Sequence, residues 1–309
     1  MAREHAYGAI PSPKDSRDYK AKEHLNMGTL PEECLPDEYA PVINQYNVSS
    51  CVAHALSTMK WYQEEREKRS NREFSTDFIY HNRTEDDWQG KGMYTREACK
   101  HLCEDGVVLK KDLPTNTEYP NMGIKNMVKG LKGQALPYNG TKYISLADKN
   151  DIKEAIFQYG ACVLSIHVPV SFDAFWFKDK KDMKLPMPKS DEDKAGYHAI
   201  CAFGYTKDGI LIQNSWGEAW GNNGVAIIPW SYPLNEAWVV VDKIKDWDII
   251  ELQIDNKEYT FNGEVKESDV APTIKDNRTL VPLRLIGEIL GAEVDYWEKD
   301  KKIIIRKER

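Results

Sequence analysis

Residues 41–56 of the chain read PVINQYNVSSCVAHAL, a polar loop that leads into small and apolar residues at helical spacing. No Gly or Pro follows Cys51 as far as residues 64–69, a charged run expected to face solvent, so the pattern predicts a helix that begins at this cysteine. A thiol at a helix N-terminus lies near the positive end of the helix dipole, which favours the thiolate. Ser49 and Ser50 are candidate caps for the first backbone amides. The alternative interpretation is an inert cysteine packed in the core.

Two segments far along the chain favour a reactive Cys51. Residues 195–200 read AGYHAI, and residues 213–217 read QNSWG, with WGNNG at 220–224. A cysteine nucleophile needs an imidazole that accepts its proton and a third group that orients the imidazole. Cys-His-Asn is one such set.

A predicted β-hairpin explains how His198 and Asn214 meet. Residues 197–205 read as a strand, Asp-Gly at 208–209 forms a turn, and residues 210–214 return as a second strand. Cross-strand neighbours lie within about 5 Å of each other at Cβ. A register slip of one residue would send one side chain to the far face of the sheet.

These motifs resemble those of papain-like cysteine peptidases. In such chains the His and Asn follow the Cys by roughly 130–150 residues, an interval that His198 fits and Asn214 slightly exceeds. The resemblance implies an α+β fold of two lobes, one helical and one β. It covers roughly residues 35–245 and rests on PVINQ at 41–45, the cysteine at 51, GYHA at 196–199, and NSWG at 214–217 with Trp-Gly at 220–221.

The resemblance also implies a role for each reactive residue. Cys51 is the nucleophile, His198 is the general base and acid, and Asn214 orients the imidazole. Gln45 donates its side-chain amide to the oxyanion together with the backbone N–H of Cys51, and Trp216 shields the His198–Asn214 hydrogen bond from water. The implied reaction is peptide-bond hydrolysis through a thioester acyl-enzyme. A thiol amidase or peptidoglycan hydrolase with the same triad, and a non-catalytic binding protein on a peptidase scaffold, are the alternatives.

Four residues are predicted to bind the peptide or protein substrate. Gly92 precedes a predicted helix over residues 95–104, at the place where the family offers loop backbone to an extended substrate. An ordinary helix-entry turn is the alternative for Gly92, because Gly is a common turn residue. The substrate-binding set is Gly92, Tyr197, Trp216 and Trp220.

The chain departs from the family pattern near the nucleophile. Val48 and Val52 stand where the family has a half-cystine and an aromatic residue, so the disulfide beside the nucleophile cannot form. Without Cys51 five cysteines remain, and an odd number cannot all pair within the chain, so we expect most to be reduced. Residues 99–103, CKHLC, offer three possible metal ligands, whereas a structural zinc site normally takes four. We predict no metal and no cofactor.

Residues 1–40 are rich in Pro, Lys, Asp and Glu and show no sustained period. They read as extended or turn structure, since the residue before a Pro avoids the helical region. The alternatives are a short prosegment lying over the cleft and a structural arm packed on the catalytic domain. The arm is favoured, because there is no helical repeat and no evident processing site.

The last part of the chain reads as a separate unit, which places the catalytic domain at residues 41–247 and a small α+β domain at 248–309. Residues 249–261 predict a hairpin, 283–290 a short helix closed by a Gly, and 292–306 a second strand pair. The pattern resembles the copper amine oxidase N-terminal-like module of bacterial surface and wall proteins. It contains no His or Cys, so we predict no copper. Binding of cell-wall material and a packing appendage are the two alternatives for its role.

Composition excludes several classes of partner. The net charge is −7 and the sequence pI is about 5.6, so there is no global basic field to attract nucleic acid. No apolar run approaches the ~18 residues of a membrane span. The first residues, MAREHA, open no apolar signal segment. We expect a protein that is cytoplasmic as synthesised, with later release to the cell surface or medium left open.

Overall fold

The computed structural model describes residues 6–25, 28–67, 72–83, 92–115, 122–169, 172, 183–189, 194–242, 250–261 and 264–307. The chain divides into two compact units, Met1–Lys243 and Ile244–Arg309, here called unit 1 and unit 2. The boundary predicted after residue 247 lies outside the described residues.

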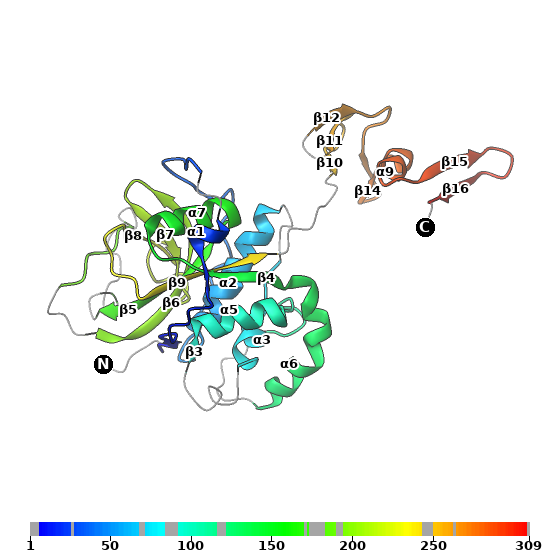
Figure 1. The fold of residues 1–309 in the computed structure, drawn as a ribbon. Helices are drawn as coiled ribbons and strands as arrows, with labels where there is room; N and C mark the ends of the chain where they lie inside the picture. The colour runs from blue at the N-terminus through cyan, green and yellow to red at the C-terminus, as the bar shows by residue number, and fades with distance from the viewer. Residues whose placement is uncertain are drawn as a thin grey trace. The chain divides into compact units, whose positions relative to one another are not determined.

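Unit 1 is built on a seven-stranded sheet with the order β2-β4-β9-β5-β6-β7-β8 (Figure 1). β2 runs parallel to β4, and every other neighbouring pair is antiparallel. β5 and β6 lie inside the sheet, where both of their faces are available for packing. The strands are β2 (Tyr19–Lys20), β4 (Gly140–Ser145), β5 (Cys162–Pro169), β6 (Lys194–Thr206), β7 (Gly209–Gln213), β8 (Val225–Pro229) and β9 (Glu236–Asp242).

Two hydrophobic clusters cover the sheet from opposite sides. Side chains of α2, α3 and α5 form one cluster with residues of the sheet, and α7 forms the other (Figure 1). A short parallel pair, β1 with β3, lies beside the first cluster. These elements are β1 (Ala9–Ile10), α1 (Ala21–His24), α2 (Cys51–Arg66), α3 (Thr76–His81), β3 (Met93–Tyr94), α5 (Thr95–Glu104), α6 (Met122–Ala135), the 3₁₀ turn η1 (Leu136–Tyr138) and α7 (Lys149–Tyr159).

Alternate residues of β5 and β6 belong to different clusters. Val163 and Cys201 pack with α2, whereas Cys162 and Ile200 pack with α7. This follows from the two-residue period of a strand. The strands are apolar on both faces, as a central strand covered by helices requires.

The central helix α2 is buried from Cys51 to Glu64. The expectation that residues 64–69 face solvent is wrong for Glu64, which pairs with Lys60 at 3.5 Å. Lys60 also pairs with Asp242 at the end of β9. A buried charge is stabilised by such partners, and removal of one partner costs ~3–5 kcal/mol. The pair therefore ties α2 to the sheet.

Unit 2 consists, where it is described, of small separate pieces. A three-stranded antiparallel sheet β10-β11-β12 is followed by two hairpins, β13-β14 and β15-β16, with one helix between them. Their bounds are β10 (Ile250–Leu252), β11 (Glu258–Phe261), β12 (Glu264–Glu267), β13 (Thr273–Lys275), β14 (Arg278–Leu280), α9 (Leu283–Ile289), β15 (Glu293–Trp297) and β16 (Lys302–Arg306).

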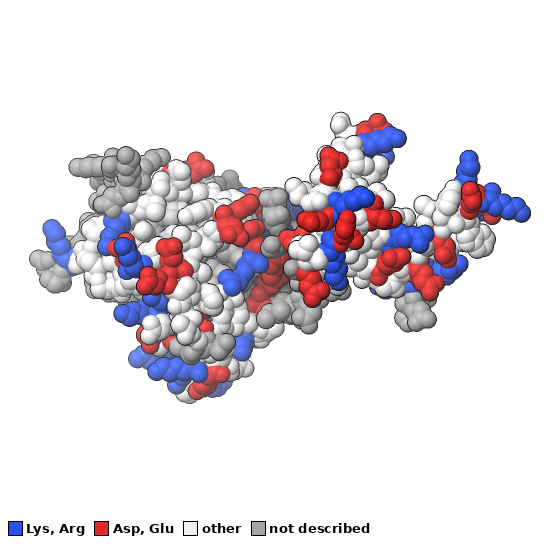
Figure 2. All heavy atoms as spheres, turned by 90° about the horizontal axis from the view of Figure 1, so that it is seen from above, with Lys and Arg blue, Asp and Glu red and all other residues white. Residues whose placement is uncertain are grey.

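The surface charge is mixed in both units. On the face shown in Figure 2, basic and acidic side chains are interspersed among the described residues, without a continuous basic stripe. Within the described ranges, no helix combines the length and the apolar character needed to cross a membrane.

Candidate active site

The predicted nucleophile lies where α2 meets β6. Cys51 is the first residue of α2 and is completely buried. The backbone N–H of Ala199 donates to Cys51 Sγ at 3.4 Å, and Ala199 directly follows His198. The predicted capping role is wrong for Ser50, because its hydroxyl contacts His54 Nδ1 at 3.2 Å and caps no amide. The helix therefore begins beside the predicted base, with the sulfur against the strand that carries it.

His198 and Asn214 are joined by a hydrogen bond. His198 Nε2 lies 2.7 Å from Asn214 Oδ1, and both side chains are buried. The backbone N–H of Ser215 donates to the same Oδ1 at 2.8 Å, which identifies this atom as the acceptor. His198 Nε2 is then the donor, so the other ring nitrogen, Nδ1, is the one that can accept a proton.

The hairpin brings this pair together, although the two residues are not opposite each other. In the β6–β7 register Cys201 faces Gln213, so Asn214 lies just past the end of β7. The backbone N–H of Asn214 donates to Gly224 O at 2.9 Å, which holds the residue after the strand ends. The side chain of Asn214 reaches His198 from this loop position.

Two tryptophans back the His–Asn pair. The rings of Trp216 and His198 have centroids 4.7 Å apart and planes at 33°. Trp220 is completely buried behind Trp216, with ring centroids 6.1 Å apart, and also packs on Phe172. The structure thus places Trp216 beside the His198–Asn214 pair and Trp220 one side chain further from it, and both indole rings are buried, without exposed surface for a substrate.

Gln45 is oriented by Ser215, a residue to which the sequence assigned no role. The Ser215 hydroxyl donates to Gln45 Oε1 at 2.6 Å, and the Gln45 backbone N–H donates to Ser215 O at 2.9 Å. The amide nitrogen, Gln45 Nε2, is thereby turned the other way, where it donates to Val48 O at 2.8 Å and to Ala6 O at 2.9 Å. Ser215 directly follows Asn214, and this position is the sequence feature from which its role beside Gln45 could have been predicted.

Residues 6–10 lie over the predicted site. Gln45 Nε2 donates to Ala6 O, and the backbone N–H groups of Gly8 and Ala9 lie close enough to the Cys51 sulfur to lower its pKa. The ring of Tyr7 lies edge-on to both His198 and Trp216, with centroids 6.3 Å away in each case. The sequence favoured an arm packed on the body of the domain, whereas this part of residues 1–40 lies on the reactive groups themselves.

Gly92 lies against this segment, whereas Tyr197 packs on a side chain of β5. The N–H of Met93, next to Gly92, donates to Gly8 O at 2.8 Å. A Cβ on Gly92 would clash with that same oxygen, and its φ of +139° also favours Gly. The backbone beside Gly92 therefore binds an extended segment, here residues of the chain itself. Tyr197 is half-buried and stacks on His167, with ring centroids 4.2 Å apart.

Burial is the main influence on the pKa of the Cys51 thiol. It raises the pKa of Cys51 to about 11, and the N–H groups of Ala199, Gly8, Val52 and Ala9 offset only part of this effect. The expectation that the start of the helix favours the thiolate is wrong for this closed form, because the low-polarity surroundings penalise the charge more than the amides stabilise it.

The family comparison agrees with this geometry. The model of the papain family of cysteine proteases matches residues 35–230. The chain belongs to the papain family of cysteine proteases. A second model, described as the copper amine oxidase N-terminal domain, matches residues 235–305.

Curated relatives of the family match in part. A 70-residue segment is 39% identical to an uncharacterised peptidase C1-like protein of Acanthamoeba polyphaga mimivirus and covers 22% of each chain. Cathepsin K of Mus musculus is 26% identical over 142 residues, which are 44% of this chain and 40% of cathepsin K. Mexicain of Jacaratia mexicana is 25% identical over 133 residues, which are 43% of this chain and 56% of mexicain. The chain therefore spans between about a fifth and about a half of the length of these relatives.

Solved structures share the fold. Xylellain, a cysteine protease from Xylella fastidiosa, superposes with a TM-score of 0.65 at 23% identity, over 78% of this chain and 98% of xylellain. Procathepsin B from Trypanosoma congolense gives a TM-score of 0.57 at 15% identity, over 77% of this chain and 86% of its own. The predicted papain-like α+β fold is confirmed.

The name of the second family model raises the question of copper. Copper in proteins is held mainly by His, Cys and Met side chains, and residues 248–309 contain none of these. These residues do not fit a copper site. Among the described residues of the whole chain, no group of three or more His, Cys, Asp or Glu side chains could hold a metal, and the six cysteines are free thiols.

Proposed function

We propose that the protein is a cysteine peptidase that hydrolyses peptide bonds through Cys51, His198 and Asn214. The observation that carries the proposal is the meeting of four groups at one point. Cys51 and Gln45 come from one stretch of the chain and His198 and Asn214 from another, and three contacts join them: Ala199, next to His198, donates to the Cys51 sulfur, His198 is bonded to Asn214, and Ser215, next to Asn214, is bonded to Gln45. Nucleophile, base, orienting group and oxyanion donor together meet the requirements of acyl transfer.

The first step forms a thioester. His198 Nδ1 takes the proton of Cys51, while Asn214 Oδ1 holds the ring through Nε2. The thiolate attacks the peptide carbonyl carbon, and the C–S bond forms as the carbonyl π electrons move to oxygen. The amide of Gln45 and the N–H of Cys51 stabilise this oxyanion, and each donor contributes ~2.7–4 kcal/mol. His198 then gives its proton to the leaving nitrogen as the C–N bond breaks.

The second step restores the enzyme. Water attacks the thioester carbon, and His198 accepts the proton that water loses. The C–S bond breaks, the carboxylic acid leaves, and the proton returns to Cys51. The sequence of steps is hydrolysis with no external oxidant or reductant.

Unit 2 is proposed as a binding domain for cell-wall material. Large apolar side chains that are at least one-third exposed support this role, among them Tyr296 and Trp297 at the end of β15. A contiguous apolar surface marks a contact site for another molecule, and exposed side chains of this kind can contribute to one. Sedimentation of the full chain with cell-wall preparations tests it: Trp297→Ala should weaken co-sedimentation several-fold, and unchanged sedimentation would contradict the proposal.

The test of the peptidase is Cys51→Ala, assayed on unfolded protein and short fluorogenic peptides. Loss of the nucleophile should lower turnover at least about 10³-fold, as for other residues that act as a catalytic unit. The matched control is Cys103→Ala, which removes a half-buried thiol outside the site and should leave turnover within a factor of about two. Equal activity of Cys51→Ala and wild type would contradict the assignment. Release from cell-wall fragments without peptide cleavage would instead support the amidase.

A further inference from the structure

A buried carboxamide lies directly before Asn214. Gln213 is the last residue of β7, and the steps of hydrolysis described above do not use its side chain. Gln213 Nε2 donates to Ala40 O at 3.0 Å and to Pro41 O at 3.2 Å. Its Oε1 accepts from the Tyr62 hydroxyl at 2.8 Å. Both polar atoms of this carboxamide therefore have partners inside unit 1, and its orientation is fixed.

Tyr62 holds the oxygen end of the carboxamide. Burial raises the pKa of Tyr62, so the phenol stays protonated and donates its proton to the hydrogen bond. The Tyr62 ring stacks on Phe203 of β6, with centroids 4.7 Å apart and planes at 2°, and its oxygen accepts from the N–H of Ala40 at 3.2 Å. Tyr62 belongs to α2, about three turns after Cys51. The hydroxyl is thus fixed on the helix that carries the sulfur.

The hydrogen bonds of Gln213 join three parts of unit 1 that supply the candidate site. The first part is α2, which begins at Cys51. The second is the chain at residues 40–41, which leads to Gln45, and the third is the end of β7, which leads to Asn214. A shift of any one part would break a buried hydrogen bond of Gln213, and a buried polar group without its partner is costly. Gln213 therefore resists relative movement of these three parts.

The side chain of Gln213 lies on the opposite face of the sheet from the His198–Asn214 pair. Gln213 lies opposite Cys201 in the β6–β7 pairing, and Cys201 packs with α2. His198 is three residues from Cys201 along β6, so its side chain points to the other face. A slip of β7 by one residue would exchange the two faces and turn Asn214 away from His198. The hydrogen bonds of Gln213 to residues 40–41 oppose such a slip.

We propose that Gln213 is a positioning residue of the peptidase. Held by Tyr62 and by the carbonyl groups of residues 40–41, it keeps Asn214 turned toward His198. Without this support the imidazole loses its fixed orientation, and Nδ1 is no longer held ready to accept the proton of Cys51. The effect on turnover rests on the proposed peptidase function, whereas the effect on the His198–Asn214 hydrogen bond is independent of that function.

Two variants remove the support to different extents. Gln213→Met keeps a side chain of similar length and removes all three hydrogen bonds of the carboxamide. Tyr62→Phe keeps the stacking on Phe203 and removes the hydroxyl that binds Gln213 Oε1 and the N–H of Ala40.

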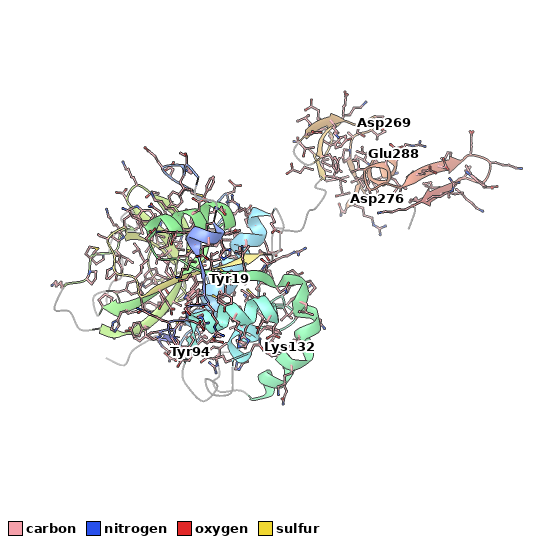
Figure 3. The ribbon with its side chains drawn as sticks, in the orientation of Figure 1. Tyr19, Tyr94, Lys132, Asp269, Asp276 and Glu288 are labelled. Carbon is pink, nitrogen blue, oxygen red and sulfur yellow. The ribbon has the colours of Figure 1, made fainter. Side chains whose placement is uncertain are left out.

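The matched control is Gln63→Met. Gln63 and Gln213 are each 3% exposed, and Gln63 Nε2 also donates to a backbone carbonyl, Val240 O, at 2.7 Å. Val240 belongs to β9, which carries none of the proposed site residues. Lys132→Gln changes a partly exposed side chain of α6, labelled in Figure 3, and is the reference for a substitution outside these contacts.

The first readout is the imidazole N–H of His198, followed by NMR on the full chain with histidine labelled at its ring nitrogens. The resonance is assigned by its loss in His198→Gln. A proton held between Nε2 and Asn214 Oδ1 exchanges slowly with water. Gln213→Met should raise this exchange rate about tenfold or more and Tyr62→Phe about threefold or more, whereas Gln63→Met and Lys132→Gln should stay within about twofold of wild type.

The second readout is steady-state kinetics on a short fluorogenic peptide. Misplacement of a group by about 1 Å can lower turnover ~100-fold, so Gln213→Met should lower kcat about 10- to 100-fold with KM within about threefold. Tyr62→Phe should lower kcat about three- to tenfold. Because Gln213 acts through Asn214, a double variant of Gln213→Met with Asn214→Ala should be no slower than Asn214→Ala alone. Gln63→Met should lower the melting temperature as much as Gln213→Met does and leave kcat within about twofold of wild type.

The exchange rate and kcat together decide between the outcomes. If Gln213→Met and Tyr62→Phe both leave the exchange of the His198 N–H at the wild-type rate, the positioning role is refuted, even when turnover establishes the peptidase. If exchange accelerates and no form hydrolyses peptides, Gln213 positions the pair and the peptidase function falls. If Gln63→Met lowers kcat as much as Gln213→Met, the effect is a general loss of packing and the role is refuted.

Two further results are also decisive. If Gln213→Met does not fold, Tyr62→Phe is judged by the same two measurements, because its ring still stacks on Phe203. A wild type without a slowly exchanging His198 N–H would contradict the hydrogen bond on which the positioning role depends.

Discussion

Unit 1 encloses its polar groups, whereas unit 2 leaves apolar groups in contact with solvent. Gln45, His198 and Asn214 are almost completely buried in unit 1. In unit 2, Val265 is 71% exposed and Trp297 50%. The cause is size: the seven-stranded sheet is covered on both faces, while sheets of two or three strands cannot bury both of theirs.

The difference indicates how each unit meets other molecules. In unit 1 the hydrogen-bonding groups of the candidate site bind Ala6 and Gly8 of the chain itself. These residues must move before another molecule can bind there. The surface of unit 2 needs no opening to make contact. The predictions below test these statements in order of decreasing expected effect.

The largest effect concerns Gln45, the proposed oxyanion donor. Gln45→Ala should lower kcat about 100- to 1,000-fold, the usual loss for one such donor. Steady-state kinetics on a fluorogenic peptide measures it. Gln134→Ala, at an exposed position of α6, is the control, and equal kcat values for the two variants would remove Gln45 from the mechanism.

The second effect is the pH dependence of Cys51 alkylation in the closed form. The thiolate is the reactive species, and burial raises the pKa of Cys51 to about 11. Below that pKa each pH unit raises the thiolate fraction tenfold, so the alkylation rate should rise about 100-fold from pH 7 to pH 9. Gly8→Val should push residues 6–10 away from Ser49 O and thereby expose Cys51, so this variant should give a flatter profile. A flat profile in the wild type would show that the sulfur is already a thiolate.

A smaller effect is expected at Ser215. Ser215→Ala removes the hydroxyl that orients the Gln45 amide. A single hydrogen bond contributes ~0.5–1.5 kcal/mol, so kcat should fall about two- to tenfold with KM almost unchanged. Ser145→Ala, at the partly buried end of β4, is a control. A loss as large as that of Gln45→Ala would mean that Ser215 does more than position the amide.

The smallest effect tests the separation of the units directly. Deletion of residues 248–309 should change the cleavage of short peptides by less than about twofold, because the proposed catalytic residues all belong to unit 1. Peptide hydrolysis by the truncated and full chains measures it. Complete loss of cleavage by a folded truncated chain would make unit 2 part of the active unit.

Local sequence patterns were sufficient to predict several elements that position the candidate site. The start of α2 at Cys51, the hairpin before Asn214 and the α+β class follow from helix propensity, strand alternation and turn residues close in sequence. The choice of Cys51, His198, Asn214 and Gln45 came from motifs and from the family resemblance, and their catalytic roles stay a prediction. The prediction that residues 64–69 face solvent was wrong for Glu64, because periodicity does not distinguish a solvated Glu from one that pairs with Lys60 inside the domain.

The sequence alone thus determined which helices and strands form and which side chains are proposed to react. Three features depended on contacts between residues far apart in sequence: the support of Gln45 by Ser215, the raised pKa of Cys51, and the position of residues 6–10 over the sulfur. Each is the result of desolvation or close packing, which depend on everything that surrounds a group in space. Only the folded chain brings Gly8 between Ser49 and Gly92, and with it closes the site.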